Sequence, residues 1–485
     1  MKKDKTIRKK IAELERESRK LCDFSAQQNL LNKSATEYAE LFYHSNHQSK
    51  AFQPFDDTMY QIFDKPLSEE GTDSEEIFSF IEKYIISPGL NSASGRNFGY
   101  IPGSNLFASA IGDYMAAVTN RYASVYSLSP GPALLEDRLI KWMAELVGYH
   151  TGAGGYLSSG GSIANMTAVV AARDHAGLTG KDYPRAVAYL TKHSHHCIDR
   201  ALNLAGLREC IRRYIPMDDA FRMNPRELNN QIIDDANKGF IPWLLVATAG
   251  TTNSGAVDPL DEIGSIARLH RLWFHVDAAY GGFFLLTGHG RRKLAGIELS
   301  DSVVLDPHKS LFLPYGTGAL LVKDVNHLVK SHDYQANYLK HVESENVIYS
   351  SADISPELTK HFRALRMWLP LKLHGLKVFK EALEEKLLLA NYLWNEFSNM
   401  KDIETGPPPE LSIFMFRWVP KAGDPEEMNR KLREALLQDG RIFLSTTEAD
   451  GKFCFRVAVL SVNTHLKEAD ILVDVVKEKI GEINN

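Results

Sequence analysis

The chain has 485 residues, of which 44% are hydrophobic and 24% charged, and its formal net charge is -5. This composition is typical of a globular protein with two or three domains. The weak negative charge excludes a strongly basic surface of the kind that binds nucleic acid or anionic lipid. No apolar run approaches the roughly 20 residues that span a bilayer, and no hydrophobic stretch follows the basic start. We therefore expect a cytoplasmic protein whose partner is a small molecule or another protein chain.

Helical patterns without a core of their own occupy the first part of the chain, residues 1–105. Ile7, Ile11, Leu14 and Leu21 recur at helical spacing among charges, and a second helical stretch covers residues 34–45. The apolar faces of these helices must be covered. We expect them to pack on a larger body or on a second subunit.

The middle of the chain, residues 106–370, alternates helical patterns with short apolar runs. Four such runs lie at 185–190, 241–249, 272–279 and 301–306. Runs of this kind, separated by helix-length segments, predict buried parallel strands in an α/β sheet that helices cover on both faces. Each run ends in polar or glycine residues, and ligands bind at the carboxyl ends of such strands. We expect the four ends to converge on one crevice.

The pattern changes in the last part, residues 371–485. A long helix is predicted over 377–397, and strand-like runs follow at 414–419, 441–446 and 453–460. These features predict a smaller α+β domain. The cysteines Cys22, Cys197, Cys210 and Cys454 form no CxxC pair, which favours reduced thiols over disulfides or a zinc ribbon.

A glycine pair precedes a helical pattern in GGSIAN, where Gly161 and Ser162 stand at the predicted helix start. Free backbone N–H groups and the helix dipole at such a start form a seat for phosphate. A plain helix cap is the alternative. No Walker loop GxxxxGK[ST] occurs in the chain.

Asp277 closes the predicted strand in HVDAAYGG. A buried carboxylate requires a cationic partner or a proton. It is either a structural ion pair or cap, or a group that keeps the nitrogen of a bound heterocycle protonated.

The segment TKHSHHC offers His193, His195, His196 and Cys197 as metal ligands. Alternation along a strand end separates His196 from the other two histidines, and no second ligand pair lies nearby. We expect no metal here. An imidazole stacked on a planar cofactor explains the cluster better, and a core histidine is the alternative.

Lys309 follows His308 in the apolar context LDPHKSLFL, although lysine is seldom buried. Desolvation lowers the pKa of a lysine, and a neutral amine is the nucleophile that forms a Schiff base with an aldehyde. A phosphate seat, a buried acid and this lysine all stand at ends of strands in one predicted sheet. They match the phosphate, ring nitrogen and aldehyde of pyridoxal 5'-phosphate (PLP).

At these residues the chain resembles the PLP-dependent amino acid decarboxylases of the aromatic-L-amino-acid and glutamate decarboxylase group. The likeness runs from about Glu75 to the carboxyl end. It rests on GGSIAN, HSHHCIDRA, ATAGTTNSG, HVDAAYGG, DPHK and NYLKH, which occur in the order and at the spacing of the family.

The resemblance implies the PLP-transferase fold of type I and a role for each matching residue. Lys309 matches the Schiff-base lysine, Asp277 the acid on the pyridine nitrogen and His195 the imidazole that stacks on the ring. Tyr338 matches the tyrosine that returns a proton after carbon dioxide leaves, which favours a decarboxylase over an aldehyde synthase. The other implied cofactor contacts are Gly161, Ser162, Thr252, Ala279, Asp306 and His308.

Two positions depart from the family pattern. Gly103 stands where animal aromatic decarboxylases carry threonine, which weakens the case for a catechol substrate. Asp306 stands where many members have asparagine, which leaves its cofactor contact open. The expected substrate contacts are Tyr100, Ile101, Pro102, Gly103 and Arg456, and Tyr122 and Tyr126 are expected to add to the aromatic wall.

An aromatic L-amino acid fits this wall best, and phenylalanine, tyrosine, tryptophan and DOPA are the candidates. Methionine or a branched aliphatic amino acid is the alternative, because apolar pockets separate similar side chains by only about 1–3 kcal/mol. A PLP lyase or aldehyde synthase on the same fold, and a binding protein without activity, are further alternatives. The resemblance also implies a homodimer with active sites shared between the subunits.

Overall fold

The structure is a computed structural model that describes residues 2–21, 26–64, 66–101, 103–332 and 349–484. The predicted contacts Pro102 and Tyr338, and Cys22, lie outside the described residues. The chain divides into two compact units: Met1–Ser49 with Phe55–Gly89, and Lys50–Pro54 with Leu90–Asn485. We describe each by itself.

The first unit is helical, as the sequence predicts. It contains α1 (Lys2–Ser18), α2 (Ala26–Ser45), α3 (Tyr60–Phe63), α4 (Ser74–Phe80) and a π-helical turn at Ile81–Ile86. Within this unit the Tyr38 hydroxyl donates a hydrogen bond to Glu82 at 2.7 Å. On α1, Ile7, Ile11 and Leu14 are each more than half exposed.

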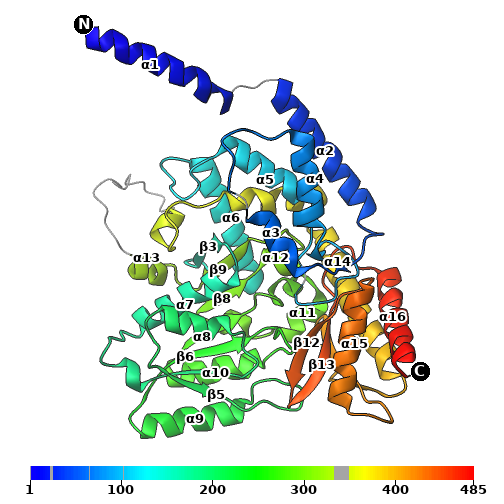
Figure 1. The fold of residues 1–485 in the computed structure, drawn as a ribbon. Helices are drawn as coiled ribbons and strands as arrows, with labels where there is room; N and C mark the ends of the chain where they lie inside the picture. The colour runs from blue at the N-terminus through cyan, green and yellow to red at the C-terminus, as the bar shows by residue number, and fades with distance from the viewer. Residues whose placement is uncertain (1, 22–25, 65, 102, 333–348, 485) are drawn as a thin grey trace. The chain divides into compact units, whose positions relative to one another are not determined.

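A seven-stranded sheet is the centre of the second unit (Figure 1), in the order β3-β9-β8-β7-β6-β4-β5. The four predicted runs form β4 (Ala186–Leu190), β6 (Ile241–Thr248), β7 (Trp273–Asp277) and β8 (Ser302–Leu305), and neighbours among them pair in parallel. β5 (Ile211–Tyr214) extends the parallel part. β9 (Gly318–Val322) is antiparallel to both β8 and β3 (Gly154–Ser158). The prediction of a mostly parallel sheet is confirmed.

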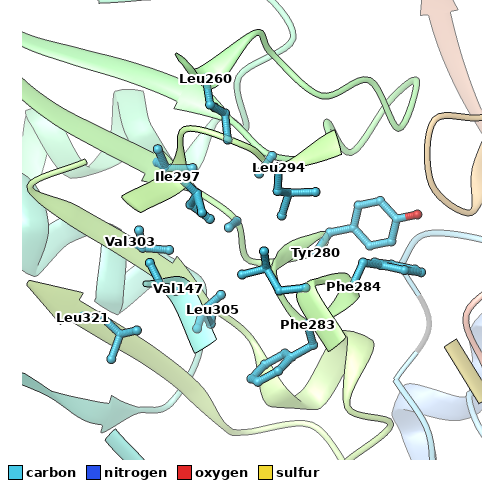
Figure 2. Packing of buried hydrophobic residues seen from close by; sticks show 14 of the residues in the cluster. Val147, Leu260, Tyr280, Phe283, Phe284, Leu294, Ile297, Val303, Leu305 and Leu321 are labelled. Carbon is cyan, nitrogen blue, oxygen red and sulfur yellow. The ribbon is translucent and has the colours of Figure 1, made fainter. Parts of the chain in front are cut away.

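Side chains of the sheet alternate between two cores. Val303 and Leu305 lie in one core, which Figure 2 shows together with Val147 and Leu260 from the covering helices, whereas Val304 lies in the other. The first core is covered by α6 (Pro130–Val147), α9 (Pro225–Asn237) and α10 (Leu260–His270), and the second by α7 (Gly161–His175) and α8 (Cys197–Leu204). Strands buried on both faces carry unbroken apolar runs, which explains their pattern in the sequence.

The carboxyl-terminal part forms a four-stranded antiparallel sheet in the order β10-β11-β13-β12. Its strands are β10 (Ile403–Thr405), β11 (Ile413–Trp418), β12 (Ser445–Ala449) and β13 (Lys452–Ala458), and α15 (Pro425–Asp439) and α16 (Leu466–Asn484) complete it. The predicted strand at 441–446 is mostly wrong. Only its last two residues belong to β12, because Phe443 instead exchanges backbone hydrogen bonds with the segment around Asn97.

The predicted helix at 377–397 belongs to α14 (Arg363–Ser398), which is broken at Gly375 by a φ of 72°. The remaining elements are β1 (Phe52–Gln53), β2 (Gly89–Leu90), α5 (Phe107–Thr119), α11 (Gly288–Lys293), α12 (Pro307–Ser310) and α13 (Asn326–His332).

Candidate active site

The segments that follow β4, β6, β7 and β8 meet at a cavity of about 430 Å³. His195 reaches it from the segment after β4, Thr252 from that after β6, Asp277 from the end of β7 and Lys309 from α12. Because these strands are parallel, their carboxyl ends lie at one edge of the sheet. The expected convergence on one crevice is confirmed.

The turn from β3 into α7 supplies Gly160, Gly161 and Ser162 to the same cavity. Gly160 is the N-cap of α7, and no side chain caps this helix. The amide of Ile163 donates to the backbone oxygen of Gly160, but Gly161 and Ser162 at the start of the helix can offer their amides to an anion, and the helix dipole adds to the attraction. This end of α7 has the donors of a phosphate seat.

Lys309 lies beside a carboxylate and not among apolar groups alone. Its Nζ is 3.1 Å from Oδ2 of Asp306, the residue that precedes α12. Burial lowers the pKa of the Lys309 ammonium, but the carboxylates of Asp306 and Asp277 outweigh it and raise the pKa above its ordinary value. The expectation of a lowered Lys309 pKa is wrong in this structure, because the sequence did not show that the Asp306 carboxylate lies beside the amine.

The position of the Asp306 carboxylate requires glycine at two neighbouring positions. Its side chain is 2% exposed, and a Cβ on Gly161 would lie 2.8 Å from Oδ2, while a Cβ on Gly318 would lie 2.7 Å from Oδ1. Among the described residues Oδ1 has no hydrogen-bond partner. A buried acceptor of this kind, next to an amine in a cavity, is suited to a polar ligand.

Asp277 is held by two amides. Its Oδ1 accepts from the backbone N–H of Ala279 at 3.1 Å, and its Oδ2 accepts from Nδ2 of Asn165 at 3.3 Å. The side chain is buried but lines the cavity. Asp277 is thus an oriented acceptor for a ligand that carries an N–H group.

Only one histidine of the cluster at 193–196 lines the cavity. Nδ1 of His195 accepts the backbone N–H of Cys197 at 3.3 Å, and burial lowers the pKa of His195, which favours the neutral ring. His193 stacks on Phe221 instead, with ring centroids 5.2 Å apart. In the described chain no three His, Cys, Asp or Glu side chains gather as metal ligands.

Thr252, Ala279 and His308, which the sequence also predicts, line the cavity. Nδ1 of His308 lies 2.6 Å from the backbone oxygen of Thr317, a hydrogen bond that orients the ring.

Of the predicted substrate residues, the four that the structure describes lie outside the lining. Tyr100 is 58% exposed and stacks on Phe443, and Ile101 is buried. Arg456 donates to the backbone oxygen of Thr252 at 2.7 Å, and burial lowers its pKa to about 10. Gly103 touches the cavity indirectly, since its N–H donates to the hydroxyl of Tyr315, which lines it.

Tyr122 and Tyr126 do not line the cavity of this chain either. The hydroxyl of Tyr122 is 3.5 Å from that of Thr359, and the backbone N–H of Tyr126 donates to Ser350. The expected place of these two residues in the aromatic wall of a site shared between subunits stays a prediction.

The aromatic lining comes instead from Tyr280 and Tyr315, and polar lining from Asn165 and Cys197. Burial raises the pKa of Cys197 to about 12, so this side chain is a thiol. The sequence marked two of these lining residues only indirectly. Asn165 stands one helical turn after Gly161, and Tyr280 follows Ala279 in HVDAAYGG. Nothing local marked Tyr315.

The fold and the cavity together define an enzyme of the PLP type, since the lysine, the acid and the helix start fit the aldehyde, the ring nitrogen and the phosphate of that cofactor. Residues 57–419 match the family model described as pyridoxal-dependent decarboxylase conserved domain, and the chain belongs to this family. It is a PLP-dependent amino acid decarboxylase.

Relatives with different substrates resemble this chain. An aromatic-L-amino-acid decarboxylase of Bacillus atrophaeus is 31% identical and aligns over 83% of this chain and 84% of its own. The acidic amino acid decarboxylase GADL1 of Xenopus tropicalis is 29% identical over 87% and 86%. The crystal structure of Oryza sativa TDC with PLP and tryptamine shares the fold, with a TM-score of 0.89, 24% identity and coverage of 95% and 99%.

None of the helices in the described ranges combines the length and the apolar character that crossing a membrane requires.

Proposed function

We propose that this enzyme removes the carboxyl group of an aromatic L-amino acid and releases the amine and carbon dioxide. The observation that carries this choice is the charge of the cavity: among its described lining residues, Lys309 supplies the single Lys or Arg side chain. A side-chain carboxylate of the substrate would lack a further cation, and burying it unpaired is costly. The rings of Tyr280 and Tyr315 favour an aromatic side chain.

The roles in cofactor binding follow from the contacts above. Lys309 would hold the aldehyde group, the first turn of α7 at Gly161 and Ser162 the phosphate, and Asp277 the pyridine nitrogen. His195 would stack on the ring, with Ala279 on the other side. When bound, PLP supplies a ring that accepts the electron pair left on Cα as carbon dioxide departs.

The residues of the chain stabilise the charge that develops in this step. Asp277, fixed by two amides, would keep a proton on the ring nitrogen of the bound cofactor and so stabilise the charge that the ring takes up. Lys309 would hold the aldehyde group again at the end of the cycle, once its Nζ, which lies 3.1 Å from Asp306, has given up a proton. Tyr338 is proposed to deliver the proton to Cα.

The proposed substrate contacts remain Tyr100, Ile101, Pro102, Gly103 and Arg456. The proposed role of Arg456 is supported by the hydrogen bond from its guanidinium to the backbone oxygen of Thr252, because Thr252 lines the cavity.

A screen of the twenty amino acids for carbon dioxide release tests the substrate. We expect tyrosine, tryptophan, phenylalanine or DOPA to give the highest kcat/KM, and glutamate to give none above background. Highest activity with glutamate or aspartate would contradict the argument from cavity charge. Lys309→Ala is the control and should abolish both carbon dioxide release and the absorbance of the bound cofactor.

An aliphatic or sulfur amino acid, such as valine or methionine, is the second candidate, because Ile163 and the apolar faces of the two tyrosines would also accept it. An aldehyde synthase or another PLP lyase is the third. Measuring amine, aldehyde and hydrogen peroxide in the same reactions separates them, since a decarboxylase yields the amine without the other two.

We further propose a cytoplasmic homodimer in which residues 1–105 form the dimerisation segment, 106–370 the PLP-binding domain and 371–485 the small domain. The exposed row of Ile7, Ile11 and Leu14 on α1 supports a partner for this helix. Light scattering should give the mass of two chains. A triple change of these residues to serine should weaken association, whereas changing the exposed charges Lys5 and Lys9 should not.

A further inference from the structure

A chain of buried polar side chains lies behind Asp277. Trp273, His275 and Asp277 alternate along β7 and therefore share one face of the strand. Ser302 on β8 is the register partner of His275, and Asn165 comes from α7, which covers this face. Trp273, His275, Ser302 and Asn165 are each at most 3% exposed.

Four hydrogen bonds connect these residues to the carboxylate. Nε1 of Trp273 lies 2.8 Å from the Ser302 hydroxyl, which lies 2.8 Å from Nδ1 of His275. Nε2 of His275 lies 2.7 Å from Oδ1 of Asn165, and Nδ2 of Asn165 lies 3.3 Å from Oδ2 of Asp277. The chain therefore runs without a gap from the indole to the cavity.

The direction of each bond follows from the chemistry of the two ends. A carboxylate only accepts, so Asn165 turns its NH₂ group to Asp277 and its oxygen to His275. That oxygen only accepts, so Nε2 of His275 carries the proton. Burial lowers the pKa of His275 to about 4, and a neutral ring has no second proton, so Nδ1 accepts from Ser302. The Ser302 oxygen in turn accepts from the indole, which only donates.

We propose that Trp273, Ser302, His275 and Asn165 are positioning residues for Asp277. Their aligned hydrogen bonds all donate toward Oδ2, which stabilises the charged carboxylate and fixes its plane. Asp277 lines the cavity, so its fixed carboxylate would be available to the ring nitrogen of the cofactor. The inference deepens the proposed function and rests on the role proposed there for Asp277.

The central variant is His275→Leu in the full-length protein, with cofactor affinity measured by spectrophotometric titration of the apoenzyme with PLP. Without the imidazole donor, the Asn165 oxygen loses the hydrogen bond that fixes the orientation of the amide, and the bond from its NH₂ group to Asp277 is less well held. We expect PLP to bind roughly tenfold or more weakly, as for the removal of groups that orient a ligand. His275→Gln should restore most of the affinity, because its amide can donate to Asn165.

The distance of each residue from Asp277 along the row of hydrogen bonds predicts how strongly its replacement weakens PLP binding. Ser302→Ala should weaken PLP binding less than His275→Leu, and Trp273→Phe least, because each lies one bond further from Asp277. The matched control is Tyr156→Phe, which removes another buried hydrogen bond to α7, from Tyr156 to Thr167 at 2.7 Å, that is not connected to Asp277. It should leave PLP affinity unchanged.

A second measurement is made on the protein with its own His275. In protein labelled with ¹⁵N-histidine, the His275 ring should show a protonated Nε2 and a bare Nδ1 at pH 7.5, with His275→Gln identifying its signals. The opposite tautomer, or a doubly protonated ring, would overturn the proposal.

The outcomes separate this inference from the proposed function. Weaker PLP binding in Asp277→Asn together with unchanged binding in His275→Leu would overturn the positioning role of the four hydrogen-bonded residues, and would leave the role of Asp277 standing. Unchanged binding in Asp277→Asn would overturn the role of Asp277 and, with it, this inference.

Discussion

Asp306 controls the charge of Lys309 in this cavity. The sequence marked the lysine, but the partner could not be predicted, because a residue before a proline can point to either side of the turn that follows. We predict that Asp306→Asn lowers the pKa of Lys309, because it removes a carboxylate 3.1 Å from Nζ that favours the ammonium, while burial continues to favour the neutral amine. The midpoint pH for trapping PLP on Lys309 with borohydride, measured by mass spectrometry, should fall accordingly.

Asp324→Asn is the control for this change, because the Asp324 side chain is half exposed and pairs with His327. Its midpoint should match that of the unchanged enzyme. A midpoint for Asp306→Asn at or above the unchanged value would contradict the ion pair.

Gly103 makes room for Tyr315. A Cβ at this position would lie 2.9 Å from the Tyr315 ring and 3.0 Å from the backbone oxygen of His308, neither of which can yield without moving the cavity wall. We predict that Gly103→Thr lowers kcat/KM by about 10- to 100-fold, and Gly103→Ala by less. Gly180→Thr, at a glycine with no atom within 4 Å of a Cβ, should have no effect. Equal kcat/KM for both threonine variants would refute the steric argument.

At the scale of elements, a buried ion pair ties the segment before α14 to α6 and β3. Lys360 Nζ lies 2.5 Å from Oε1 of Glu136, which also accepts the N–H of Leu157. Both side chains are buried. We predict that Lys360→Met lowers the free energy of unfolding by about 3–5 kcal/mol, because it leaves the carboxylate unpaired. Denaturant titration measures this loss.

The double variant Glu136→Leu with Lys360→Met should recover part of that loss, since neither charge is then buried alone. The control Lys238→Met breaks an exposed pair with Asp234 and should cost less than about 1 kcal/mol. Equal losses for the buried and the exposed pair would contradict the prediction.

The elements that the sequence predicted share one physical property. β4, β6, β7 and β8 are buried on both faces, so their apolar runs stand out. The sequence did not predict β3, because Gly154 and Gly155 carry no hydrophobic pattern. The segment at 441–444 was wrongly predicted as a strand, because it has an apolar pattern although it lies outside the sheet. For the site, Lys309, Asp277 and His195 were found because motifs place them at strand ends. Tyr315 and the contact of Asp306 depend on tertiary packing, which no local pattern encodes.

At the scale of the whole molecule, partly and fully buried histidines predict how stability depends on pH. Among the residues that the structure describes, burial lowers the pKa of five histidines: His193, His195, His275, His308 and His327. Below pH 6.5 the unfolded chain binds protons that the folded chain does not, so stability is fully present above that pH and falls as the pH decreases. Asp258, whose pKa burial raises to about 6, acts in the opposite direction, because in the folded chain it takes up a proton as the pH falls through about 6.

The denaturant midpoint should therefore fall steadily between pH 7.5 and pH 6. Replacing His327 by Gln should reduce the slope, while replacing the exposed Lys238 by Gln should not. A midpoint that stays constant or rises on acidification over this range would contradict the neutral state of the buried rings.

One helix joins the two sheets of the second unit. After its break at Gly375, α14 contributes Leu383 and Leu387 to the core of the large sheet and Leu393 and Phe397 to that of the small sheet. Because this helix packs into both cores, loosening it exposes part of each. Melting of the two sheets is consequently one cooperative event, which a calorimetric scan would record as a single peak.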